Sequence, residues 1–293
     1  MSRMESRIGW CFTALLFVAF ALGASGAWHG EDALLKANIP VGGIAWLWLF
    51  YAQRKASWMH WRGTLQFAAC WLIFLLFKGI AQFWIGAFRD GVLLAADRAL
   101  WGGLSLPEHA LALETPWLSE VVSLGYLAFY FVVLLPVIWF SWRRKTSEAH
   151  VFFLGLSAMY LVGYTGYLLV PASGPFAAFP DIFPYPVRGG AISALLASIV
   201  TEGITGMDVF PSLHVGITLY VLGFFALGTV RGYRIVAALL MLIFVPLTIA
   251  TIYLRYHYGV DLIAGTALAC CVLVMVRRER RLYSNRFSNG DLP

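Results

Sequence analysis

The sequence predicts an all-α fold, a polytopic bundle in which about eight helices cross a membrane. Hydrophobic residues make up 60% of the chain, charged residues only 12%, and the mean hydropathy is +0.76, a composition typical of integral membrane proteins. The apolar runs approach the roughly 20 residues that a spanning helix requires. They are apolar on every face, whereas the strands of a membrane barrel alternate over about ten residues.

Seven apolar runs have about the length of a spanning helix, and a shorter eighth run contains two tryptophans. The seven are 9–27, 64–88, 117–141, 150–170, 211–230, 234–254 and 258–276, and the eighth is 38–53. The first run ends in small residues, as a signal peptide does, and its cleavage would leave the remaining layout unchanged.

The basic residues predict the orientation, because Lys and Arg concentrate in cytoplasmic loops. With eight spans and a cytoplasmic N-terminus, 15 of the 21 Lys and Arg residues fall on the cytoplasmic side. We therefore expect a multi-pass protein of the inner (plasma) membrane with both termini in the cytoplasm. Because the basic residues are spread over separate short loops, they indicate contact with anionic lipid and no nucleic-acid partner.

Two longer segments are expected on the opposite, extracytoplasmic side. Residues 89–116 predict an amphipathic helix at the membrane interface, and residues 171–210 are rich in proline. Proline stiffens irregular backbone, and a stiff external loop favours a shaped site over a plain connection.

The sequence FPSLH begins the sixth predicted span on that same side. Pro211 suits the first turn of a helix, so Ser212 and His214 are expected beside free backbone N–H groups at the positive end of the helix dipole. Such a position binds anions, phosphate especially. The alternative is a capping serine followed by a histidine at the level of the lipid head groups.

The sequence RYHYGVD begins the eighth predicted span, again on the extracytoplasmic side. His257 and Asp261 are four residues apart, so on a helix they share a face and Asp261 can accept from one ring nitrogen of His257. The other nitrogen is then left as a nucleophile or base. The alternative is a structural pair that stabilises the helix start, but ionisable groups inside a span are costly and indicate function.

The combination of PSLH with HYxxD some forty residues later resembles the type 2 phosphatidic-acid phosphatase superfamily. This resemblance implies a six-helix catalytic core in which His257 is the nucleophile on phosphorus, Asp261 orients it and His214 is the acid/base. The motifs differ from the phosphatase pattern at Leu213, where glycine is usual, and at 250–251, where Ser-Arg is usual. FPSLH with TIYLRYHYGVD is more similar to the inositol phosphorylceramide synthase branch, an inositolphosphotransferase, and the resemblance covers about 95–275.

The missing phosphatase arginine raises the question of what binds the phosphate oxygens, since phosphoryl transfer needs cations or N–H donors there. The candidates are Arg255, Arg188, and the N–H groups near Ser212 and Gly174. Lys78 lies inside a predicted span, where a buried partner or a catalytic role are both open.

We therefore expect an integral membrane lipid phosphotransferase that works through a phosphohistidine intermediate, without metal or cofactor. Its partners would be membrane lipids, phospholipid or prenyl/sphingolipid donors and acceptors. Two alternatives remain, a metal-independent lipid phosphate phosphatase and a non-catalytic lipid transporter. The expected division is N-terminal membrane helices at 1–60, a catalytic transmembrane domain at 61–280 and a cytoplasmic tail at 281–293.

Overall fold

The structure is a computed structural model that describes residues 3–183, 187, 189–203 and 205–288. Throughout this part of the chain all regular secondary structure is helical, which confirms the predicted fold class. Seven of its segments are long and apolar enough to cross a membrane. The protein is therefore a multi-pass helical bundle.

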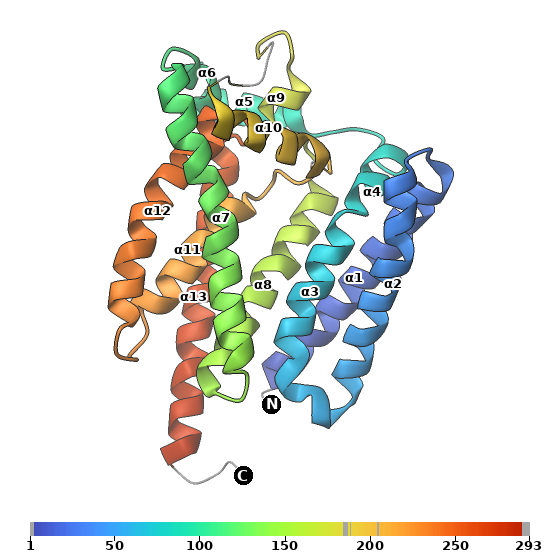
Figure 1. The fold of residues 1–293 in the computed structure, drawn as a ribbon, viewed down its shortest axis with the longest axis vertical. Coiled ribbons are helices and arrows are strands. Elements are labelled where there is room, and N and C mark those ends of the chain that lie inside the picture. Colours follow the sequence, from blue (N-terminus) through green and yellow to red (C-terminus); the bar gives the residue numbers. More distant parts are fainter. Residues whose placement is uncertain (1–2, 184–186, 188, 204, 289–293) are drawn as a thin grey trace.

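The helices fall into three groups. The N-terminal group is α1 (Arg3–His29), α2 (Ala33–Arg54), the 3-10 helix η1 (Ala56–Trp61), α3 (Arg62–Phe74) and α4 (Phe77–Phe83). The other bundle helices are α7 (Pro116–Trp142), α8 (Ser147–Leu169), α11 (Leu213–Ala226), α12 (Tyr233–Tyr253) and α13 (Gly259–Ser288). The short helices α5 (Asp90–Leu100), α6 (Leu106–Leu111), α9 (Pro175–Ala178) and α10 (Ala191–Gly203) gather at one end, opposite the end where α1 begins and α13 finishes (Figure 1).

Each predicted span coincides with helix in the bundle, with two differences. The run at 64–88 is divided between α3 and α4 by a turn at Leu75 and Leu76. The run at 211–230 contains only the 14-residue helix α11. α11 packs against α7, α8, α12 and α13, so protein rather than lipid surrounds it and a full-length span is not needed.

The predicted interfacial segment forms two helices, α5 and α6, instead of one. Ser105 caps α6 and exchanges hydrogen bonds with Glu108 in a capping box. Glu108 also pairs with Arg98 of α5, whose Nε lies 2.9 Å from Oε2. This hydrogen bond lowers the pKa of Glu108 to about 2, and the pair clamps the two helices together.

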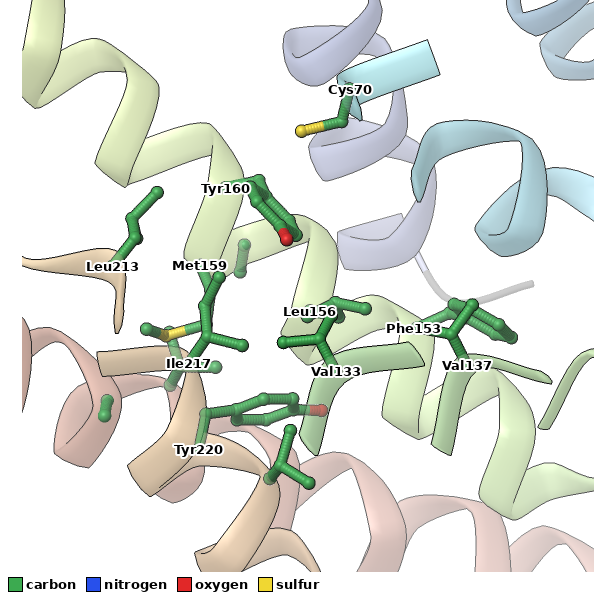
Figure 2. Close-up of a cluster of buried hydrophobic side chains, with 14 of the residues drawn as sticks. Cys70, Val133, Val137, Phe153, Leu156, Met159, Tyr160, Leu213, Ile217 and Tyr220 are labelled. Carbon is green, nitrogen blue, oxygen red and sulfur yellow. The ribbon is translucent and has the colours of Figure 1, made fainter. Parts of the chain in front are cut away.

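The core between α7, α8 and α11 is filled by large apolar side chains (Figure 2). Leu156 and Met159 of α8 pack beside Ile217 and Tyr220 of α11. The Tyr220 hydroxyl donates to the Phe152 carbonyl at 2.6 Å, so even this polar group is satisfied. These contacts fix α11 against α8.

α11 and α13 approach each other most closely at a glycine. A Cβ atom on Gly265 would lie 2.3 Å from the carbonyl oxygen of Ser212, so only glycine allows this spacing. The contact brings the first turn of α11 beside the first turn of α13. The two histidine motifs are therefore held together by backbone packing.

Lys78 has a structural partner. Its Nζ lies 3.1 Å from Oδ2 of Asp32, which also caps the N-terminus of α2. The ion pair joins α4 to the start of α2, and it is half-exposed. Lys78 therefore has a partner, but not the buried one that the sequence left open, because 37% and 33% of the two side chains are exposed.

Candidate active site

His214 lies in the first turn of α11, where it was predicted. Ser212 is the N-cap: its Oγ accepts from the Val215 N–H at 3.4 Å, and its own N–H donates to the Asp261 carbonyl at 3.0 Å. Pro211 precedes this cap, so the prediction that it occupies the first helical turn is wrong. Ser212 thus ties α11 to α13, and both of its polar hydrogen-bonding groups are used within the protein.

His257 lies in the turn between α12 and α13 and not on a helix. The N–H groups of Tyr256 and His257 both donate to the Thr251 carbonyl at 3.1 Å. Asp261 is in the first turn of α13, and its Oδ2 accepts from the Tyr258 N–H at 2.8 Å. The predicted shared helix face is therefore wrong, although the turn does bring the two side chains together.

The two side chains are buried, with 2% of His257 and none of Asp261 exposed. Nδ1 of His257 lies 3.5 Å from Oδ2 of Asp261, longer than a close hydrogen bond. Catalytic hydrogen bonds are often long without substrate and tighten in the complex. Asp261 is thus placed to orient His257 through Nδ1.

The two histidines meet directly. Nε2 of His257 lies 3.3 Å from Nδ1 of His214, and Nε2 of His214 lies 3.0 Å from the Tyr126 hydroxyl. Asp261, His257, His214 and Tyr126 therefore form a continuous row, which we call the catalytic row. If Asp261 accepts from His257 Nδ1–H, then Nε2 of His257 carries the lone pair and accepts from His214 Nδ1–H. Nε2 of His214 in turn accepts from the Tyr126 hydroxyl.

Tyr126 of α7 is a site residue that sequence reasoning left out. Interfacial tyrosines are ordinary in membrane proteins, so its position in the sequence carried no signal. Its contact with His214 depends on how α7 packs against α11.

Two aspartates of α5 hold the surrounding backbone and were also missed. Asp90 accepts from the N–H groups of Ser173 (3.0 Å) and Gly174 (2.9 Å) and from the Tyr258 hydroxyl (2.9 Å). Asp97 accepts from the Val260 N–H at 2.9 Å, at the start of α13. Their spacing of seven residues, which puts both on one face of a helix, was the available signal.

The predicted phosphate ligands have different outcomes. The Gly174 N–H donates to Asp90, so it anchors the turn after α8 and is not an open phosphate donor. Gly174 has φ 88°, and a Cβ there would lie 2.7 Å from the Tyr256 carbonyl oxygen, so glycine is required. Arg188 lies outside the described residues.

Arg255 lies in the same pocket as the two histidines. Arg255 is not on a helix: it sits in the turn after α12 with φ 65°. Its carbonyl accepts from the Phe176 N–H at 3.0 Å, which holds this conformation. Its buried guanidinium pairs with Glu114 and lies 5.7 Å from the centre of the Phe183 ring.

Two adjacent cavities share lining residues at the catalytic row. The first, the polar pocket, is small and is lined by His214, His257, Arg255, Asp208 and Tyr256, among others. The second, the aromatic cavity, has a volume of about 330 Å³ and lies between α3, α7, α8, α10 and α11. Tyr126, Val200, Asp208 and His214 line both cavities.

Asp208 stands at the junction of the two cavities. The only side-chain hydrogen bond that reaches its carboxylate within the described residues comes from Thr205 Oγ1, at 2.8 Å. Burial raises the pKa of Asp208 above its ordinary value. A buried carboxyl group therefore lines the space beside the histidines.

Comparison with known families gives one match. The family model described as the PAP2 superfamily matches residues 92–275, more than half of the chain. This range includes Asp97, His214, His257 and Asp261, but not the two N-terminal helices. No curated protein and no solved structure matches the chain.

Proposed function

The chain belongs to the PAP2 superfamily, and on that premise we propose that it is a membrane lipid phosphotransferase. It moves a phosphate-containing head group between lipids, or from a lipid to an alcohol, through a phosphohistidine on His257. Superfamily membership supports action on lipid phosphoesters by a phosphatase or phosphotransferase. The observation that carries the proposal is the catalytic row, which ends in a polar pocket beside an apolar cavity.

In the first step the substrate phosphorus enters between the two imidazoles and replaces their mutual contact. Nε2 of His257 attacks the phosphorus, the N–P bond forms and the P–O bond to the lipid breaks. His214, which enters this step protonated on both ring nitrogens, gives its Nδ1 proton to the departing oxygen and is left neutral as the base for the second step. Asp261 stabilises the positive charge that develops on the His257 ring, which is the orienting role of a carboxylate behind a catalytic histidine.

In the second step the reaction reverses with a different alcohol. His214 takes the proton from the acceptor hydroxyl, the acceptor oxygen bonds to phosphorus, and the N–P bond to His257 breaks. One group acting as acid and then as base is the expected consequence of microscopic reversibility. Tyr126 holds His214 from the other ring nitrogen in both steps.

Arg255 is the cation that would bind the phosphate oxygens in place of the arginine that the phosphatase pattern has at position 251. Arg255 lines the polar pocket with both histidines, and its guanidinium pairs with Glu114. A phosphate oxygen in the pocket would share this guanidinium with Glu114, which supplies charge stabilisation in a buried site. Arg188 remains a proposed second ligand.

Transfer rather than hydrolysis is favoured by the surroundings of the row. His257 is 2% exposed, and the larger of the two cavities beside the row is lined mainly by aromatic and aliphatic side chains. An organic acceptor fits such a space better than bulk water does. The inositolphosphotransferase branch suggested by FPSLH and TIYLRYHYGVD is part of this proposal.

We also propose that the site faces the extracytoplasmic side of the inner (plasma) membrane, with residues 1–60 as accessory helices and 61–280 as the catalytic domain. The site lies at the α5–α6 end of the bundle, while the basic loops at Arg143–Lys145 and Arg231 lie at the other end. The positive-inside rule then puts the site outside.

The test is to incubate the purified protein in lipid nanodiscs with head-group-labelled phospholipids, with and without acceptor alcohols, and to identify products by mass. Transfer of the labelled head group to the acceptor supports the proposal. Release of free phosphate with no transfer product would favour the phosphatase alternative. Lipid turnover that survives His257→Ala would refute the catalytic assignment, and movement of lipid without chemistry would favour a transporter.

A further inference from the structure

The aromatic cavity is not explained by the chemistry of the catalytic row alone. Phosphoryl transfer needs the polar pocket, but the aromatic cavity is larger and extends away from it between α3, α7 and α8. Its walls include Trp71, Tyr130, Tyr160, Tyr164 and Ile217. A space of about 330 Å³ with this lining suits an apolar ligand.

Only one of the two histidines lines the aromatic cavity. His214 lines both the polar pocket and the aromatic cavity, whereas His257 lines only the polar pocket. In a phosphoryl transfer the leaving oxygen departs in line, on the side of phosphorus opposite the nucleophile. The cavity therefore opens where the alcohol oxygen leaves or attacks, next to its proton donor.

The deep end of the cavity is closed by the bundle core. One turn beyond Tyr130, Tyr160 and Ile217, the same three helices contribute Val133, Leu156 and Tyr220, which are buried in the core and do not line the cavity (Figure 2). Trp71 is held at this depth by a hydrogen bond from its Nε1 to the Tyr160 hydroxyl at 2.9 Å. Along α8 the lining from Tyr160 to Tyr167 covers two helical turns, about 10 Å.

The side of the cavity faces lipid. Leu75, in the turn after α3, and Ile199 of α10 line it and are 38% and 37% exposed. α10 forms a roof, held to α7 because Glu120 accepts from the backbone N–H groups of Ile192 (3.0 Å) and Ser193 (2.8 Å) at its start. A chain can thus reach the cavity sideways from the bilayer, beneath α10.

We propose that the aromatic cavity binds one hydrocarbon chain of the lipid alcohol that reacts beside His214, and that its closed end selects chain length. The proposal rests on the proposed function for the identity of the reacting alcohol. The polar–apolar boundary of the lipid lies at Asp208 and Tyr126, where the two cavities join. Selection is steric, because a chain taken from the bilayer already has an apolar environment.

The principal test fills the deep end of the cavity. Ile217→Trp is expected to lower turnover of long-chain lipids by roughly tenfold relative to short-chain ones, because an overfilled apolar site is strained. Ile249→Trp is the matched control, since Ile249 is 53% exposed on α12 and outside the cavity. Trp71→Ala enlarges the same space and should shift preference toward bulkier chains. An unchanged chain-length profile in both cavity variants would overturn the proposal.

A second measurement does not depend on turnover. A phospholipid with a photoreactive diazirine in one acyl chain is irradiated with the protein in nanodiscs, and adducts are mapped by mass spectrometry. Adducts should concentrate on the cavity walls of α3, α7 and α8 and fall several-fold in Ile217→Trp but not in Ile249→Trp. Adducts spread evenly over lipid-facing helices would refute the chain site even if turnover is observed. Cavity adducts without any turnover would retain the site and refute the proposed function.

Discussion

The two aspartates of α5 and Asp261, which lies behind the proposed nucleophile His257, are all buried, but they differ in how fully their carboxylates are hydrogen-bonded. Asp90 and Asp97 have both carboxylate oxygens engaged by N–H or O–H donors. Asp261 has a buried Oδ1 without a hydrogen-bond partner among the described residues, and its Oδ2 is 3.5 Å from His257. Asp90 and Asp97 resemble backbone anchors, whereas Asp261 retains capacity that a reaction can use.

This difference teaches how the site is kept in place. Full satisfaction of a buried carboxylate fixes geometry, because any movement leaves a costly unpaired charge. Incomplete satisfaction costs stability but allows the hydrogen bond to strengthen when charge develops on the neighbouring ring. Substitutions in the two groups should therefore separate loss of chemistry from loss of structure.

The largest effect is expected from His257→Gln. Removal of the nucleophile should lower turnover roughly 10⁴-fold or more while the protein remains folded. His109→Gln is the matched control, because His109 is an exposed histidine of α6 at the same end of the bundle. Product formation by mass spectrometry, together with the melting temperature in detergent, checks the pair, and equal activities of the two variants would contradict the assignment.

Asp261→Asn should come next, with a fall in kcat of roughly 10²–10⁴-fold, as expected when a carboxylate that orients a catalytic histidine is neutralised. Asp90→Asn should instead act on stability, because one oxygen of Asp90 becomes an amide that cannot accept the N–H groups of the 173–174 turn. Thermal unfolding and kcat per folded molecule distinguish them. The comparison fails if Asp90→Asn lowers kcat without lowering the unfolding temperature.

Tyr126→Phe should have a smaller effect, of about tenfold on kcat, because one neutral hydrogen bond to His214 is lost. Its effect should fall on kcat and on the pH profile of kcat, since the hydroxyl sets which nitrogen of His214 carries the proton. Tyr130→Phe serves as the control, because Tyr130 lines the aromatic cavity without a hydrogen bond to His214. A change in KM alone would argue for a packing role.

Asp208→Asn should have the smallest effect and one that depends on pH. Burial raises the pKa of Asp208, so the carboxyl is neutral at low pH and becomes charged as pH rises through this elevated pKa. The new negative charge faces His214, His257, Arg255 and Tyr256 in the polar pocket and should repel the substrate phosphate, raising KM at high pH. The Asp208→Asn variant should lose this rise in KM. The measurement is KM across pH in both proteins, and an equal rise in the variant would contradict the prediction.

The bundle and the two histidine motifs could be predicted from the sequence because both signals are local. Apolar length predicts spans, and polar groups such as His214 and Asp261 are conspicuous inside them. Tyr126, Asp90 and Asp97 escaped prediction because their roles depend on how α5 folds over the start of α13 and how α7 packs on α11. The shared helix face predicted for His257 and Asp261 was wrong for a related reason: the spacing argument assumed a helix, and the chain forms a turn at His257.

The 14-residue length of α11 has a consequence for how the active site is assembled. A helix of that length is about 21 Å long, less than the roughly 30 Å hydrocarbon layer. Lipid alone cannot accommodate a helix of this length well, so α11 depends on its packing against α7, α8, α12 and α13. Because His214 is carried by this helix, an incompletely assembled chain has no active site. The proposed activity is thereby restricted to molecules whose helical bundle is complete.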